Sequence, residues 1–318
     1  MNIRKPLLTA LAAILAMPVS ASADINVIAS IKPVHSLVAA VMKGAGEPSL
    51  IVDGAGSPHT YSLKPSQAAA LQDADVIFWI GDGLETFLQK PVETIGGATK
   101  TVELIHAPGL ETLGLREGGT FEKHAHDREE AGHAEAGHDH DHGAGAIDMH
   151  VWLDPANARA MVHEIADTLA AADPGNAALY EANADALSKR LDALATELSA
   201  ELKPVRGTGY VVFHDAYQYF EHRFGLSPAG SITVSPDVMP GADRLREIQA
   251  RVRELNATCV FAEPQFEPKL VSVVTEGSAA RSAVLDPLGA TVEAGPDLYF
   301  EVLRAMASSF RACLSGAS

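Results

Sequence analysis

One long helical stretch divides this sequence into two parts. It starts at Asp173-Pro174, where an acidic residue precedes a proline in the first helical position, and it continues to Leu202 before Pro204 ends it. Leucines recur along it at helical spacing, which places them on one face: Leu187, Leu191, Leu194 and Leu198. About 29 helical residues would span about 43 Å. We therefore predict a stiff linker helix over residues 173–203.

Short apolar runs alternate with amphipathic helical segments on both sides of this helix. Before it, the run Ile25–Ser30 predicts a strand and Pro33 opens a helix. After it, the run Tyr210–Phe213 predicts a strand, and the same alternation repeats. Strands that alternate with helices are typical of parallel sheets. The expected fold class is α/β, with two similar lobes of mostly parallel sheet, residues 24–172 and 204–318, joined by the long rigid backbone helix.

The N-terminus has the features of an export signal. Arg4 and Lys5 precede an apolar segment, residues 7–19, and the small residues 21–23 form an expected cleavage site. The apolar segment is shorter than a membrane-spanning helix needs, and a membrane anchor is the alternative interpretation. We expect residues 1–23 to be a signal peptide and the mature protein to be periplasmic.

The acidity of the chain limits its partners. The full sequence carries a formal net charge of −17, and loss of the two positive charges of Arg4 and Lys5 with the signal would bring it to −19. Nucleic-acid binding needs a basic surface, so we expect no nucleic-acid partner. An acidic protein attracts cations instead.

A histidine-rich stretch precedes the linker region. Residues from about 116 to 147 lack strand or helix periodicity and are rich in Gly, His and acidic residues, so we predict a mobile loop there. Six histidines of this loop are candidate auxiliary metal ligands: His124, His126, His133, His138, His140 and His142. A flexible segment loses conformational entropy when it closes around an ion, so we expect weaker binding here than at a folded site. The alternative is a solvated insertion whose composition merely tolerates metal.

Three other histidines lie at the boundaries of apolar runs, where α/β proteins bind ligands. His59 lies in the loop after the second expected strand, His150 precedes the apolar residues 151–153, and His214 ends an expected strand. Asp286 follows another apolar run. Three imidazoles and a carboxylate could form a tetrahedral zinc site between the lobes. Each of the four could instead be structural, and Asp286 could cap the turn that it begins.

The donor types bear on the choice of metal. Imidazole suits zinc, whereas manganese and iron prefer oxygen-rich sites. A Glu in place of His214 would give two nitrogens and two oxygens, so a protein selective for manganese or iron is an alternative. Four histidines lack comparable partners and are expected to be structural or on the surface: His35, His106, His163 and His222.

The chain contains two cysteines, Cys259 and Cys313. Two cysteines in an exported protein indicate a disulfide first. A pair of thiolate metal ligands is the alternative, although Cys259 lies in an apolar, strand-like run and Cys313 lies near the end of an expected helix.

Five segments carry a resemblance to a known family: His59–Ser66, His150–Pro155, Phe213–Tyr217, Phe261–Phe266 and Leu285–Gly289. Together they resemble the motifs of cluster A-I solute-binding proteins, most closely the zinc-specific ZnuA type, the periplasmic component of a zinc ABC importer. The resemblance extends over essentially the whole mature chain. It implies two lobes joined by a rigid helix, with Zn²⁺ bound as the transported ligand by His59, His150 and His214.

The same resemblance bears on the rest of the site. It implies Asp286 or a water as the fourth ligand, because Pro58 stands where a neighbouring Glu ligand would precede His59. The histidine-rich loop and the pair Cys259 and Cys313 also look like features of zinc-type members.

We therefore expect high-affinity capture of Zn²⁺ in the periplasm and delivery to an inner-membrane ABC zinc permease. We expect a monomer, to which a periplasmic zinc metallochaperone could supply metal. The sequence has no phosphate-binding loop, nucleophile elbow or His-Glu-x-x-His helix, so we expect no enzyme. A periplasmic zinc hydrolase and a metal-dependent adhesin are alternatives. Imidazole binds zinc only when neutral, which predicts release at about pH 5 to 6.

Overall fold

The structure is a computed structural model that describes residues 25–95, 97, 99–116, 146–233, 241–254, 258–266 and 269–316. The expected signal peptide, residues 1–23, and the six histidines of the expected loop lie outside them.

The N-terminal lobe is a parallel sheet in the order β2-β1-β3-β4. Its elements are β1 (Val27–Ile31), α1 (Lys32–Val41), β2 (Ser49–Val52), α2 (Pro65–Gln72), β3 (Val76–Trp79), α3 (Thr86–Thr94) and β4 (Lys100–Glu103). The central strands β1 and β3 are buried along their whole length, which explains why their sequences are continuous apolar runs rather than alternating ones.

The C-terminal lobe repeats this arrangement with the strand order β6-β5-β7-β8, again parallel throughout. Its elements are β5 (Tyr210–His214), α6 (Gln218–Phe224), β6 (Gly230–Thr233), α7 (Ala242–Glu254), β7 (Cys259–Ala262), α8 (Lys269–Thr275), β8 (Arg281–Val284) and α9 (Leu298–Leu314). In each lobe the first strand lies between the second and the third. The prediction of two similar α/β lobes with parallel sheets is confirmed.

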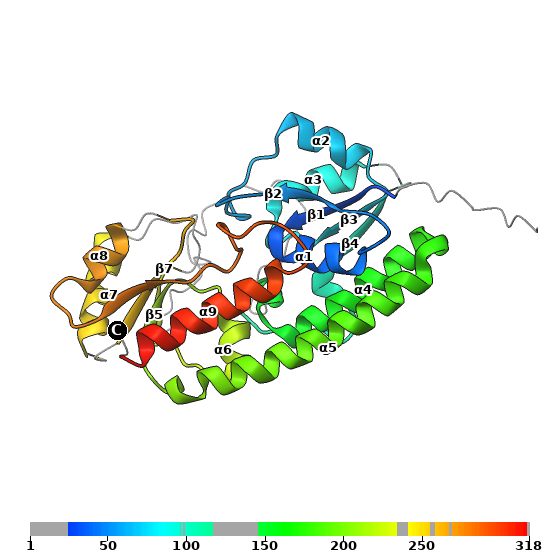
Figure 1. Cartoon of the computed structure of the whole chain (residues 1–318). Helices are drawn as coiled ribbons and strands as arrows, with labels where there is room; N and C mark the ends of the chain where they lie inside the picture. Colours follow the sequence, from blue (N-terminus) through cyan, green and yellow to red (C-terminus); the bar gives the residue numbers. More distant parts are fainter. Residues whose placement is uncertain are drawn as a thin grey trace, which may run out of the picture.

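A pair of packed helices leads from the N-terminal lobe to the C-terminal lobe. α4 (Pro155–Ala172) is followed by the long α5 (Ala177–Leu202), which packs along it and continues beneath both lobes (Figure 1). α5 has 26 residues and starts later than predicted, because Pro174 begins a short 3₁₀ turn, Pro174–Asn176. The Asp173 carboxylate does not cap this turn, since it accepts hydrogen bonds from Asn176 Nδ2 and Tyr180 Oη.

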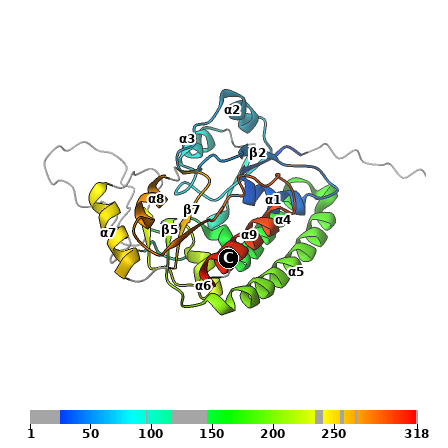
Figure 2. The ribbon, with the colours of Figure 1, turned by 60° about the vertical axis from the view of Figure 1, so that its left-hand side comes forward.

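The two lobes share one apolar core. The four leucines predicted to form a stripe on α5 are buried in it: Leu187, Leu191, Leu194 and Leu198. The last helix, α9, packs against both α5 and α1, and it lies beside α5 in both views (Figures 1 and 2). Two helices therefore tie the lobes together: α5 leads into the C-terminal lobe, and α9 starts beside α1 and ends beside β7 in the C-terminal lobe. A smaller core lies between the C-terminal sheet and helices α7 and α8.

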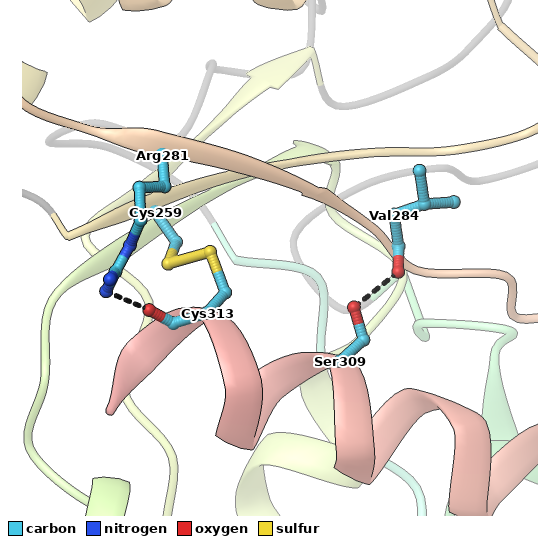
Figure 3. Close-up of a disulfide and its surroundings, with 5 residues drawn as sticks. All are labelled: Cys259, Arg281, Val284, Ser309 and Cys313. Carbon is cyan, nitrogen blue, oxygen red and sulfur yellow. Dashed lines mark hydrogen bonds between the residues drawn. A yellow bond between two sulfur atoms is a disulfide. The ribbon is translucent and has the colours of Figure 1, made fainter. Parts of the chain in front are cut away.

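The disulfide between Cys259 and Cys313 is present, which confirms that prediction. It joins the start of β7 to α9 (Figure 3). Two hydrogen bonds also attach α9 to β8: the Arg281 guanidinium donates to the Cys313 carbonyl, and Ser309 Oγ donates to the Val284 carbonyl at 2.6 Å. The cysteines are 54 residues apart in sequence. Closing a loop of that length stabilises a fold by up to about 4 kcal/mol in the chain-entropy model.

Among the described helices, none has the length and apolar character needed to cross a membrane.

Candidate metal centre

Three of the predicted ligands meet between the lobes. His150 Nε2 lies 3.4 Å from His59 Nε2 and 3.3 Å from His214 Nε2, and one ring nitrogen of each lies within 4.8 Å of the other two. His59 comes from the loop after β2, and His150 immediately precedes the 3₁₀ turn Val151–Leu153. His214 is the last residue of β5. The first two histidines belong to the N-terminal lobe and the third to the C-terminal lobe, so the site joins the two.

The orientation of His150 is set by Asp148. The Asp148 carboxylate accepts hydrogen bonds from His150 Nδ1 at 2.7 Å and from the His150 backbone N–H at 3.0 Å. A hydrogen bond at Nδ1 places the proton there and leaves Nε2 with a free lone pair. That lone pair is directed toward the other two imidazoles. The arrangement is the one in which a carboxylate orients a metal-ligating histidine.

His214 is oriented in the same way from the other lobe. Glu263, which directly follows β7, accepts a hydrogen bond from His214 Nδ1 at 2.6 Å. Both side chains are buried, with residue exposures of 4% for His214 and 3% for Glu263. Burial lowers the pKa of His214, but the charge and hydrogen bond of Glu263 outweigh it, so that the pKa lies above its usual value of 6.5.

His59 is in a different electrostatic environment. Burial is the largest influence and lowers its pKa well below the usual 6.5, and the nearby imidazoles of His150 and His214 lower it further. His59 is therefore neutral at physiological pH. A neutral imidazole is the form that binds a metal ion.

The cavity beside the three imidazoles is small. Its volume is about 10 Å³, which is room for one water-sized sphere. The rest of its wall is mostly apolar and is formed by Pro58, Trp152, Glu263, Gln265, Phe266, Pro287 and Leu288. Trp152 Nε1 donates to the Pro287 carbonyl at 2.9 Å, so this wall is itself held across the lobes. A cavity of this size suits a single ion rather than an organic molecule.

Asp286 does not belong to the cluster formed by His59, His150 and His214. Its Oδ1 accepts the backbone N–H of Gly289 at 2.9 Å, and its Oδ2 accepts that of Ala290 at 2.7 Å. Its carboxylate therefore caps the turn that begins at Asp286, the alternative that the sequence left open. The structure thus brings together three of the four residues predicted to form the site.

The four histidines expected to be structural make contacts elsewhere. His35 Nε2 contacts the Pro48 carbonyl at 3.0 Å, and His163 Nε2 lies 3.4 Å from Ser188 Oγ. His106 and His222 lie 3.6 and 3.9 Å from carboxylates of Glu103 and Glu111.

Asp148 and Glu263 were not predicted as parts of the site. Glu263 lies within one of the family-like segments and directly follows a predicted strand, so its position contained a usable signal. Asp148 precedes His150 by two residues, a spacing that lets a carboxylate reach back to the imidazole. Each carboxylate can be recognised as a partner of a histidine once the positions of His150 and His214 in the fold are known.

Known proteins are similar to this chain in sequence and in fold. The ZnuA family model, described as "Zinc-uptake complex component A periplasmic", matches residues 27–313. The high-affinity zinc uptake system protein ZnuA of Brucella suis biovar 1 (strain 1330) is 53% identical over 306 residues, which cover 91% of this chain and 92% of that protein.

Solved structures agree with this. "Crystal structure of ZnuA" has a TM-score of 0.76 at 26% identity and covers 92% of this chain and 100% of the solved chain. "Crystal structure of 138-173 ZnuA deletion mutant plus zinc bound" has a TM-score of 0.74 at 27% identity and covers 92% and 98%.

Proposed function

Because this chain belongs to the ZnuA family of periplasmic zinc-uptake components, we propose that it captures Zn²⁺ between its lobes and delivers it to an ABC-type zinc permease. His59, His150 and His214 are the ligands. One observation carries this assignment: the Nε2 atoms of the three imidazoles face one another around a cavity of ionic size.

The donor set favours zinc over manganese and iron. Three imidazoles with no carboxylate in the group form a nitrogen site, and hard divalent ions prefer oxygen ligands. Zinc takes four ligands in a tetrahedron, so three protein nitrogens leave one position. We propose water for that position, since both oxygens of Asp286 already accept backbone hydrogen bonds.

The protein acts in the periplasm as a monomer, with residues 1–23 removed as a signal peptide. The six loop histidines hold additional zinc more weakly and receive it from a periplasmic metallochaperone. Calorimetry on a variant lacking residues 120–144 tests this division of roles. The variant should retain tight binding of one zinc ion, and loss of that tight binding would show that the three-histidine site is not the primary one.

Solute capture, rather than catalysis, is the role of this family, and we propose that this chain has no enzymatic activity. Three histidines with an open zinc position could nevertheless activate a water molecule. The zinc-loaded protein should therefore be assayed with activated esters and phosphoesters. Turnover above that of free zinc, abolished in His214→Ala, would contradict the proposal.

Substitution of the ligands tests the site directly. Competition with a fluorescent zinc chelator should show that His59→Ala, His150→Ala and His214→Ala each lose at least about 100-fold in affinity, more than the 10–100-fold typical of outer-sphere changes. His163→Ala is the matched control, because His163 is exposed and distant from the group. Wild-type affinity in His214→Ala would overturn the assignment.

A further inference from the structure

The residues on either side of the histidine tract are paired. Residues 113–116 and 146–148, named here the paired stems, form a short antiparallel bridge between Gly114 and Ile147. Leu115 N–H donates to the Ala146 carbonyl at 2.9 Å, and Asp148 N–H donates to the Leu113 carbonyl at 2.9 Å. The stems belong to the N-terminal half of the sequence, and the second one carries Asp148, which orients His150.

Helix α6 of the C-terminal lobe holds both stems. Tyr219 Oη accepts the Leu113 N–H at 2.9 Å and donates to the Asp148 carbonyl at 2.7 Å, so one hydroxyl bridges the two stems. Gln218 Nε2 donates to the Gly114 carbonyl at 2.9 Å. Asp148, which fixes a ligand of the N-terminal lobe, is therefore itself fixed by the C-terminal lobe.

Arg116 completes this attachment. Its guanidinium binds Asp215 through two nitrogens, with Nε to Oδ2 at 3.0 Å, and it donates through Nη1 to Glu221 Oε2 at 2.7 Å. The side chains of Asp215 and Glu221 are only 7% and 3% exposed. Two buried carboxylates side by side repel each other without a cation between them. Asp215 directly follows His214, so Arg116 connects the first stem to the peptide that carries the ligand of the opposite lobe.

We propose that Arg116 is a positioning residue for zinc, which fixes His150 and His214 relative to each other by attaching the paired stems to the C-terminal lobe. The geometry gives the reason: its guanidinium binds next to His214, and its stem pairs with the residue that orients His150. With Arg116 in place, the positions of His150 and His214 relative to each other are fixed before the ion arrives. Without it, the lobes still share their core, but the two imidazoles lose their common support and zinc leaves faster.

The test is the rate of zinc release from the full-length protein to an excess of chelator. Arg116→Gln should release zinc about 10-fold faster or more, the lower end of what loss of an outer-sphere partner costs. Arg116→Lys keeps the positive charge but loses the contact of two guanidinium nitrogens with Asp215. Its zinc-release rate should therefore lie between those of Arg116→Gln and wild type. Arg159→Gln is the matched control, because Arg159 forms an exposed ion pair with Asp192 on α4 and α5 and should release zinc at the wild-type rate.

A second measurement separates positioning from general stability. Cobalt in place of zinc gives visible absorption bands that depend on ligand geometry, and these bands should change in Arg116→Gln but not in Arg159→Gln. Tyr219→Phe, which removes only the bridging hydroxyl, should shift release in the same direction. Unchanged release and cobalt bands in Arg116→Gln, with a lowered melting temperature of the metal-free protein, would overturn the proposal.

The inference rests on the proposed zinc site, and the two can fail separately. A failure of the site itself would appear as wild-type protein that does not bind one equivalent of zinc tightly. A failure of the positioning role would appear as tight wild-type binding with an Arg116→Gln release rate equal to that of Arg159→Gln.

Discussion

Two buried carboxylates, one from each lobe, orient two of the three imidazoles toward the cavity. Asp148 and Glu263 each accept the Nδ1 proton of one histidine and thereby leave its Nε2 free for metal. The charge of Glu263 also raises the pKa of His214, and a more basic imidazole is a stronger metal ligand. The metal affinity of the site is therefore expected to depend on residues that never contact the ion.

Glu263→Gln tests this dependence. The amide keeps an oxygen that can accept from His214 Nδ1 but removes the negative charge, so zinc affinity should fall by about 10-fold to 100-fold. Competition with a chelator at constant pH measures the change. Glu197→Gln is the control, since Glu197 lies on α5 in an exposed ion pair with Arg304 and should bind zinc as wild type does. Equal affinities in the two variants would show that the charge of Glu263 is irrelevant.

The pH dependence of zinc binding should follow the different pKa shifts of the histidines. The pKa of His214 is raised above 6.5, so this residue takes up a proton at a higher pH than an ordinary histidine would, and that proton competes with zinc. The pKa of His59 is well below 6.5, so His59 takes up a proton only at a lower pH than His214 does. Affinity should fall by about 10-fold per pH unit where one proton competes, and more steeply once a second imidazole is protonated.

Titrating zinc affinity against pH in wild type and Glu263→Gln checks this assignment. The variant lacks the carboxylate that raises the pKa of His214, so the onset of its affinity loss should move to lower pH. An onset at the same pH in both proteins would assign the first competing proton to another group.

At this scale the sequence predicted the three histidines that come together better than the two residues that orient them. His59 follows an expected strand, His214 ends one and His150 precedes an apolar run, and α/β folds bind ligands beyond the ends of their strands. Asp286 has the same kind of position but begins a turn whose backbone N–H groups need an acceptor, and the turn takes its carboxylate. The choice between capping and binding depends on where the neighbouring amides point, which linear spacing does not specify.

At the scale of elements, Lys32 connects the start of α1 to the loop after β8, which lines the cavity beside the three histidines. Only 5% of Lys32 is exposed, and its Nζ donates to the carbonyls of Gly289 at 3.0 Å and Val292 at 2.6 Å. The same loop carries Pro287 and Leu288, which line the cavity. A buried ammonium needs such acceptors, so Lys32 and the loop hold each other in place across the lobes.

Lys32→Met should destabilise the protein while leaving its ligands intact. The methionine fills similar space but leaves the loop carbonyls without their donor, which costs about 1–3 kcal/mol of unfolding free energy. Chemical denaturation of the metal-free protein measures this. Lys43→Met, at an exposed position just after α1, should change the free energy of unfolding little. Equal decreases in the free energy of unfolding in both variants would mean that the buried contacts of Lys32 stabilise the protein no more than an exposed lysine does.

The sequence predicted most elements but not how they meet. The leucine stripe on α5 and the buried strands follow from periodicity, because one face or both faces must be apolar. The late start of α5 depends on Asp173, whose carboxylate binds Tyr180 instead of capping the helix. The return of α9 onto α1 joins residues that are far apart in sequence, and local patterns carry no information about such contacts.

The whole molecule places its site where two lobes with a shared core face each other. α5 and α9 both cross between the lobes, and the main apolar cluster includes residues of each. A joint of two packed helices resists large rotation more than a single flexible linker does. We therefore expect zinc to enter and leave through local changes around the site rather than through a wide opening of the lobes.

Binding at such an interlobe site should stabilise the entire fold and should distinguish metals. An ion that binds only the native state adds about 2.7 kcal/mol at 100 times its Kd, which corresponds to a rise in melting temperature of roughly 4–5 °C for a protein of this size. Zinc should produce such a rise. Manganese at the same concentration should produce less than half of it, because the described metal group offers three nitrogens and no carboxylate.

Thermal unfolding of wild type and His214→Ala with each metal distinguishes stabilisation by an ion at the three-histidine site from stabilisation by ions bound elsewhere. The zinc-dependent rise should vanish in His214→Ala, since that variant loses the ligand of the C-terminal lobe and with it the link across the site. A rise that persists would locate the stabilising zinc elsewhere. A manganese rise equal to the zinc rise in wild type would show that the site does not select by donor type, and selectivity for zinc would then have to arise at the permease.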